Sequence, residues 1–128
     1  MRLRRSRYSQ LFVAKSEIFV YNINMKEIST DEFKPTIKLG KTIVDFYSAG
    51  CGNCKMMEPW LVQLESEHQN INFVKFNAME CDARKCLAAD MGVTSLPTLL
   101  FFKDGVEVGR LVGLKPKTLI AKKIAEVF

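Results

Sequence analysis

Two cysteines separated by two residues, Cys51 and Cys54, are the side chains of this sequence best suited to chemistry. A close pair of thiols can form and break a disulfide, or it can bind a metal ion. The pair follows a β-rich run and precedes a helical pattern, so Cys51 is expected at a helix N-terminus. Unpaired N–H groups and the helix dipole stabilise an anion there, which lowers a thiol pKa from about 8.5 toward neutral. Because thiolate is the form that attacks disulfides, the pattern favours redox chemistry.

A second pair of cysteines, Cys81 and Cys86, lies further along the chain. Three hypotheses stay open for it: inert thiols, a second redox pair, and a metal site. Arg84 and Lys85 between the two cysteines favour thiolate. Together with the first pair, these cysteines would supply the number of ligands that zinc needs. Zinc ribbons, however, place both pairs in tight loops rather than between a strand and a helix, so we expect no metal.

The length and composition describe a globular domain rather than a fibrous or membrane-spanning chain. The 128 residues suffice for one domain with its own core; 48% of them are hydrophobic and 26% are charged. No apolar run reaches the roughly 20 residues of a membrane span, so we expect no membrane association. The cysteines fall in two close pairs, which is not the spacing of a disulfide framework.

The net charge of +5 is concentrated near the N-terminus. Residues 1–24 contain five of the 19 Lys and Arg residues and one of the 14 Asp and Glu residues. That segment therefore carries +4, and the rest of the chain carries +1. A nearly neutral domain without a basic stripe predicts no nucleic-acid partner.

Residues 1–24 form a basic N-terminal extension before the domain. Three interpretations stay open: a targeting segment, an extra strand within residues 11–23, and sequence that precedes a true start at Met25. A secretory signal is disfavoured, because Lys15 and Glu17 interrupt the apolar stretch and no small-x-small cleavage site follows.

Apolar periodicity predicts alternating strands and helices over the rest of the chain. A helix capped by Ser29 or Thr30 is expected to begin near Asp31 and to end between Pro35 and Gly40. The other expected helices cover residues 52–68, 87–91 and 116–127. The expected strands cover residues 42–48, 71–76, 96–103 and 106–112, the last two joined by a hairpin turn at 104–105. This order predicts an α/β fold with a mixed central sheet of four to five strands and helices on both faces.

From Met25 to Phe128 the sequence resembles the thioredoxin family. The stretches that carry the resemblance are VDFYSAGCGNCKMMEP at 44–59, KFN at 75–77, SLPTLLFFKDG at 95–105, and Gly113. Several separate motifs at compatible spacing make the resemblance specific. It implies a thioredoxin-like domain over residues 25–128, the thioredoxin fold, and the activity of a protein disulfide reductase.

The resemblance also implies a role for each residue of the dithiol site. Cys51 resembles the nucleophile that forms a mixed disulfide with a target protein, and Cys54 resembles the thiol that resolves it. Asp45, a charge in the middle of a predicted buried strand, resembles the carboxylate beneath the dithiol. Burial would raise its pKa toward the range useful for taking a proton from Cys54. Lys75 resembles the partner of that carboxylate.

Four further positions resemble the groove that binds target proteins. Pro97 resembles the family's cis-proline opposite the dithiol, which would leave the backbone of Leu96 available to an extended target peptide. Gly113 is expected to keep the groove shallow. Gly50 stands where the family usually has Trp, so an apolar surface for targets is missing. Asn53 replaces the usual Pro and relaxes the helix start, which predicts a potential less reducing than that of an ordinary thioredoxin.

The sequence thus predicts a cytoplasmic, monomeric thioredoxin-type oxidoreductase that reduces disulfides in target proteins. It would need no bound cofactor, because the electrons move through sulfur, and a thioredoxin reductase or an equivalent donor would recharge it. Two alternatives stay open. One is an exported disulfide oxidase or isomerase, and the other is a non-catalytic binding module that keeps the fold as a scaffold.

Overall fold

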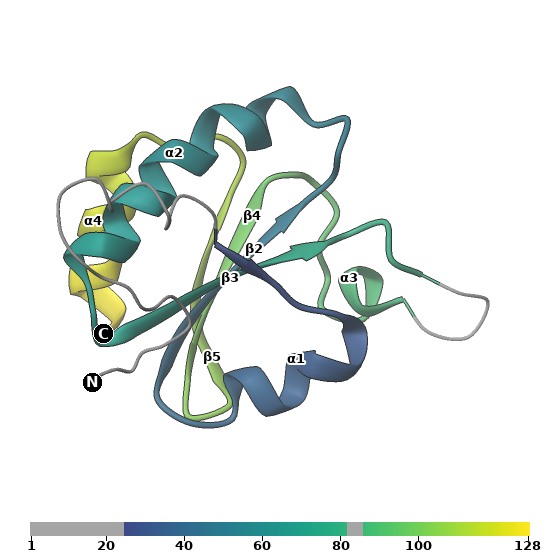
Figure 1. Ribbon diagram of the computed structural model, residues 1–128, viewed down its shortest axis with the longest axis horizontal. Helices are drawn as coiled ribbons and strands as arrows, with labels where there is room; N and C mark the ends of the chain where they lie inside the picture. The colour runs from purple at the N-terminus through teal and green to yellow at the C-terminus, as the bar shows by residue number, and fades with distance from the viewer. Residues whose placement is uncertain (1–24, 82–85) are drawn as a thin grey trace, which may run out of the picture.

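A five-stranded mixed sheet forms the centre of the protein (Figure 1). The computed structural model describes residues 25–81 and 86–128, and the interpretations of residues 1–24 and of Arg84 and Lys85 lie outside them. The strands are β1 (Lys26–Glu27), β2 (Lys41–Tyr47), β3 (Ile71–Asn77), β4 (Thr98–Lys103) and β5 (Val106–Val112), in the order β1-β3-β2-β4-β5. β1, β3 and β2 are parallel, whereas β4 and β5 are antiparallel to their neighbours.

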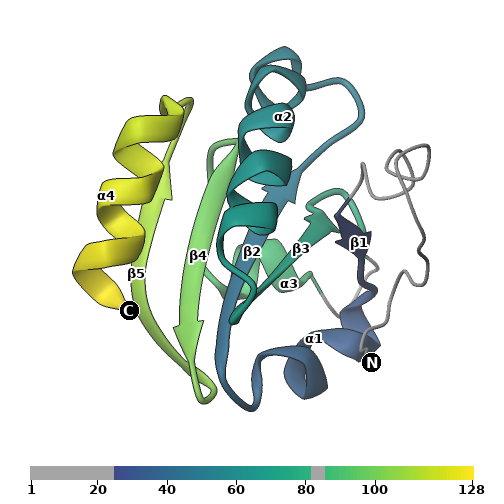
Figure 2. The ribbon, with the colours of Figure 1, turned by 60° about the vertical axis from the view of Figure 1, so that its left-hand side comes forward.

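Helices cover both faces of this sheet, which confirms the predicted fold class (Figures 1 and 2). The helices are α1 (Thr30–Ile37), α2 (Gly52–Glu67), α3 (Leu87–Asp90) and α4 (Lys117–Val127). Buried residues of α2 and α4 pack together on one face, and those of α1 and α3 pack on the other. The dithiol lies at the start of α2.

The central strand β2 separates two apolar clusters because its side chains alternate between the two faces. Ile43 belongs to the cluster under α2 and α4, and Val44 and Phe46 belong to the cluster under α1 and α3. Both faces of β2 are therefore buried, as its continuous β-rich run predicted. The alternation also places Asp45 on the α2 face, two residues beyond Ile43.

The first helix begins and ends as predicted. Ser29 is the N-cap of a complete capping box, since its Oγ accepts the N–H of Glu32 while the Glu32 carboxylate accepts the N–H of Ser29. The observed end at Ile37 lies between Pro35 and Gly40, as predicted, and Pro35 is inside the helix. Pro35 removes a single hydrogen bond near the helix end, and burial of Phe33 and Ile37 on either side of it favours the helix despite this loss.

Two strands, β4 and β1, differ from the expected ones by more than one residue. β4 begins at Thr98, so Pro97 precedes the strand instead of lying in it, since proline has no N–H to donate to a neighbour. β1 was not expected, because two residues are too few to show an alternating pattern. The Asp104-Gly105 hairpin turn is confirmed, with both residues at positive φ (49° and 87°).

Candidate redox site

Cys51 and Cys54 form a disulfide at the N-terminus of α2, with their Cα atoms 5.3 Å apart. Cys51 is the N-cap residue, and its Sγ accepts the backbone N–H of Cys54 at 3.1 Å. This N–H and the helix dipole stabilise negative charge on the Cys51 sulfur. Cys51 is partly exposed and Cys54 is buried (4% exposed), so a large partner can reach only the first sulfur directly. The predicted placement of the dithiol is confirmed.

Asp45 is buried in the sheet beneath the N-terminal part of α2. Its side chain is 3% exposed, and its Oδ1 atom has no hydrogen-bond partner in the described part of the chain. Its neighbours in the sheet are Leu99 of β4 and Lys75 of β3. The Leu99 side chain has no polar group, so the charges that act on the Asp45 carboxyl are those of Lys75 on β3 and Glu58 on α2.

Burial raises the pKa of the Asp45 carboxyl from its ordinary value of 3.8 to about 7. The cause is first the loss of hydration, which disfavours the charged form, and second the negative charge of Glu58. The Lys75 ammonium opposes both effects without overcoming them. A carboxyl group that titrates near neutral pH can both accept and return a proton under ordinary conditions.

Glu58, which the sequence did not single out, is the direct partner of Lys75. The Lys75 ammonium donates to Glu58 Oε2 at 3.0 Å and lies 5.2 Å from the centre of the Tyr47 ring. Lys75 thus acts on Asp45 through its charge, and its hydrogen bond goes to Glu58. A signal was present in the sequence: Glu58 follows Cys54 by four residues, which puts both on one face of α2.

Pro97 lies at the same end of the sheet as the dithiol. β4 runs antiparallel to β2 with Thr98 opposite Phe46, so Pro97 immediately precedes the strand where β2 nears its carboxyl end. The Leu96–Pro97 peptide bond is cis, as in the family that the sequence resembles. The carbonyl of Pro97 accepts the N–H of Gly113 at 2.8 Å, which joins this loop to the end of β5.

The glycine at position 113 is required by its backbone and not by lack of space. Gly113 has a φ of 90°, in the left-handed region that side chains disfavour. A Cβ atom at this position would meet no other residue within 4 Å. The backbone conformation therefore explains the glycine at this position. The role of Gly113 in keeping the groove shallow stays a prediction.

Comparison with known proteins decides the family. The family model described as Thioredoxin matches residues 24–126. The chain belongs to the thioredoxin family. It is 41% identical over 99 residues to a thioredoxin of Chlamydia muridarum, covering 77% of this chain and 94% of that relative. It is 35% identical over 100 residues to the mitochondrial thioredoxin-3 of Saccharomyces cerevisiae, covering 77% and 76%.

A solved structure agrees with this assignment. The oxidised form of mitochondrial thioredoxin 3 from Saccharomyces cerevisiae superposes with a TM-score of 0.71 at 33% identity, covering 80% of this chain and 94% of that one. Thioredoxins are thiol–disulfide oxidoreductases that act on disulfide targets and draw electrons from a reductase. With its Cys51–Cys54 disulfide, this member of the thioredoxin family is such an oxidoreductase, as predicted. Within residues 25–81 and 86–128, no helix is long and apolar enough to cross a membrane.

Gly50 leaves the approach to Cys51 open in this thioredoxin. The residue is exposed, and a Cβ atom built on it would meet nothing within 4 Å. Its φ is not in the left-handed region, so the backbone accepts any side chain. Space and backbone therefore both allow a larger residue at position 50.

The second pair, Cys81 and Cys86, also forms a disulfide, with the two Cα atoms 4.3 Å apart. Cys81 is exposed and follows the carboxyl end of β3, which is parallel to β2 and ends at the same edge of the sheet. Glu80 anchors this region, because its carboxylate accepts the N–H and the hydroxyl of Thr30 at 3.0 Å. In the described ranges, no three His, Cys, Asp or Glu side chains gather as a metal site would require.

Proposed function

We propose that the protein reduces disulfides in target proteins, with Cys51 as nucleophile and Cys54 as resolving thiol. The Cys51 thiolate attacks a target disulfide and forms a mixed disulfide, releasing one target sulfur as thiolate. Cys54 then attacks Cys51 Sγ, which closes the Cys51–Cys54 disulfide and releases the second target sulfur. The target gains two electrons and the dithiol loses two. The observation that carries the proposal is the disulfide at the α2 N-cap, with one sulfur exposed and one buried.

Asp45 is the proton acceptor for the Cys54 thiol in this proposal. A thiol must lose its proton before it attacks, and the buried Cys54 needs a base within the protein. The raised pKa of Asp45, about 7, suits that transfer better than an ordinary carboxyl would. Lys75 tunes the carboxyl electrostatically, since it lowers the same pKa.

Target proteins are proposed to bind in an extended form beside the dithiol. Gly50, Leu96, Pro97 and Gly113 would form this surface, and the backbone of Leu96 would pair with the target as an added strand does. The hydrogen bond between Pro97 and Gly113 supports this surface, because it joins the loop before β4 to the end of β5. The open space at Gly50 supports targets of varied shape.

The electron donor is proposed to be a separate thioredoxin reductase or an equivalent enzyme, and the working form a monomer in the cytoplasm. A reducing compartment keeps such a dithiol reduced between turnovers. The extent of the matched family region, residues 24–126, supports a domain over 25–128 preceded by an extension. The exposure of Cys81 supports thiol exchange at the second disulfide, so Cys81 and Cys86 stay a proposed second redox pair.

Insulin reduction with dithiothreitol as electron source tests the proposed function. The wild type should accelerate the reduction, and Cys51→Ser and Cys54→Ser should each fall to the background rate of dithiothreitol alone. A double variant, Cys81→Ser with Cys86→Ser, is the matched control and should keep the wild-type rate. Wild-type rates in both single variants would exclude a catalytic dithiol and favour a binding module.

A further inference from the structure

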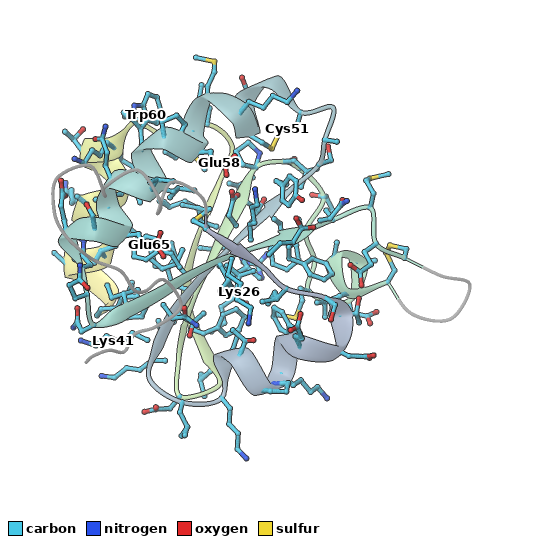
Figure 3. All side chains as sticks on the ribbon, in the orientation of Figure 1. Lys26, Lys41, Cys51, Glu58, Trp60 and Glu65 are labelled. Carbon is cyan, nitrogen blue, oxygen red and sulfur yellow. A yellow bond between two sulfur atoms is a disulfide. The ribbon has the colours of Figure 1, made fainter. Side chains whose placement is uncertain are left out.

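Three charged side chains meet on the α2 face of the sheet. Lys75 on β3 lies beside Asp45 on β2, since the two are register partners in the parallel ladder. Glu58 is on α2, one helical turn beyond Cys54, and its Oε2 lies 3.0 Å from the Lys75 Nζ. Figure 3 shows Cys51 at the start of α2 and Glu58 further along the same helix. One ammonium group thus acts on two carboxyl groups, and its ion pair is with Glu58.

The position of Lys75 is fixed from two sides. Glu58 accepts its hydrogen bond, and the Tyr47 ring lies 5.2 Å from the ammonium. The Lys75 and Glu58 side chains are only 19% and 29% exposed, so water screens this pair less than a surface pair. The other titratable groups near this cluster are Glu27, the register partner of Lys75 on β1, and the Tyr47 hydroxyl of β2, whose pKa is raised by burial, by its hydrogen bond with Glu27 and by the charges of Glu27, Glu58 and Asp45.

We propose that Glu58 is a positioning residue for proton transfer. By holding the Lys75 ammonium in an ion pair, it prevents that cation from forming a fixed salt bridge with Asp45, so Asp45 stays free to exchange a proton with Cys54. The inference rests on the proposed function, because the exchange has a use only if Cys54 must be deprotonated. In the step, the proton moves from Cys54 Sγ to the Asp45 carboxylate. The Cys54 thiolate then attacks Cys51 Sγ of the mixed disulfide, so that the Cys51–Cys54 bond forms, the bond to the target breaks, and the target sulfur leaves as thiolate.

The electrostatics agree with this geometry. Glu58 raises the pKa of Asp45, and Lys75 lowers it. A neutral amide at position 58 would remove the repelling charge and would also release Lys75 toward Asp45. Both changes favour the charged carboxylate form of Asp45, so both lower its pKa.

The Asp45 titration can be followed by carbon NMR of its carboxyl group in the full-length oxidised protein, where the dithiol itself does not titrate. We expect a midpoint near pH 7 in the wild type. In Glu58→Gln the midpoint should fall by about one pH unit or more. The matched control is Glu67→Gln, which removes a carboxylate of the same helix from an ion pair with Lys117 (2.8 Å), and its midpoint should equal that of the wild type.

A second comparison tests whether Glu58 acts through Lys75. In a Lys75→Met background, Glu58→Gln should lower the midpoint by less than it does in the wild type, because no ammonium is left to release. An unchanged midpoint in Glu58→Gln, or equal shifts in the two backgrounds, would overturn the positioning role. Insulin reduction by the wild type separates the two proposals: an active wild type without these shifts refutes only the role of Glu58, whereas an inactive wild type refutes the proposed function.

Discussion

At the scale of single residues, the site combines one accessible sulfur, one buried sulfur and one buried carboxyl group. Cys51 and Asp45 could be identified from the sequence, because a helix start and a charge inside a strand are local patterns. Glu58 could not be ranked among the other glutamates, because its importance comes from Lys75 on a strand 17 residues away. A contact between a helix and a strand depends on how the helix is rotated over the sheet, and no local pattern specifies this rotation in full.

Replacing Asp45 by Asn should stabilise the protein most at alkaline pH. The pKa of Asp45 is higher in the folded state, so its contribution to stability is full below about pH 4 and is lost as the pH rises through about 7. Asp45→Asn abolishes this loss and should raise the free energy of unfolding at pH 8 by up to about 4 kcal/mol, with a much smaller effect at pH 4.

Urea unfolding of the oxidised protein at several pH values measures this effect. Asp90→Asn, at an exposed aspartate of α3, is the control and should follow the wild-type pH dependence. A wild type whose stability stayed constant between pH 4 and pH 8, or a parallel shift of Asp45→Asn at every pH, would contradict the raised pKa.

At the scale of elements, the strands and helices with long patterns could be predicted to within one or two residues. The capping residue Ser29 and the Asp104-Gly105 turn have local chemistry that fixes their conformation. β1 could not be predicted, because its pairing with β3 decides it. The position of Pro97 just before β4 follows from its missing N–H, a constraint that the apolar run around it hides.

Gly113→Ala should destabilise the protein by about 1–2 kcal/mol, because its φ of 90° lies in the left-handed region. The matched control is Gly50→Ala. Both positions leave open space for a Cβ atom, and only Gly113 has the positive φ. Thermal unfolding should therefore show a lower Tm than the wild type for Gly113→Ala and nearly the wild-type Tm for Gly50→Ala. Equal effects of the two substitutions would show that backbone conformation is not what requires glycine at position 113.

At the scale of the whole molecule, the parallel strands β2 and β3 bring the two cysteine pairs to one edge of the sheet. The sequence predicted a mixed sheet of four to five strands but not the strand order β1-β3-β2-β4-β5. Hydrophobic patterns indicate how many strands there are, and they do not indicate which strands are neighbours. The closure of the second pair was one of three open hypotheses, because sequence spacing does not fix the distance across a loop.

Thiol counting in denaturant tests the second disulfide across the whole chain. The oxidised protein should contain no free thiol, and the fully reduced protein should contain four, since all four cysteines are disulfide-bonded in the structure. Two free thiols in the oxidised protein would mean that only the first pair closes. The variant with Cys81→Ser and Cys86→Ser should likewise contain no free thiol after oxidation and two after reduction.

Trapping of the mixed disulfide tests the central claim most directly. Full-length Cys54→Ser, in a background that also carries Cys81→Ser and Cys86→Ser, is reduced and mixed with an excess of a disulfide-containing target. It should form a one-to-one adduct that dithiothreitol cleaves, because the thiol that resolves the intermediate is missing. Peptide mass mapping should locate the bond to the target at Cys51, and Cys51→Ser under the same conditions should form no adduct through Cys54. No adduct with Cys54→Ser, or equal adduct formation by both variants in this background, would contradict the assignment of Cys51 as the nucleophile.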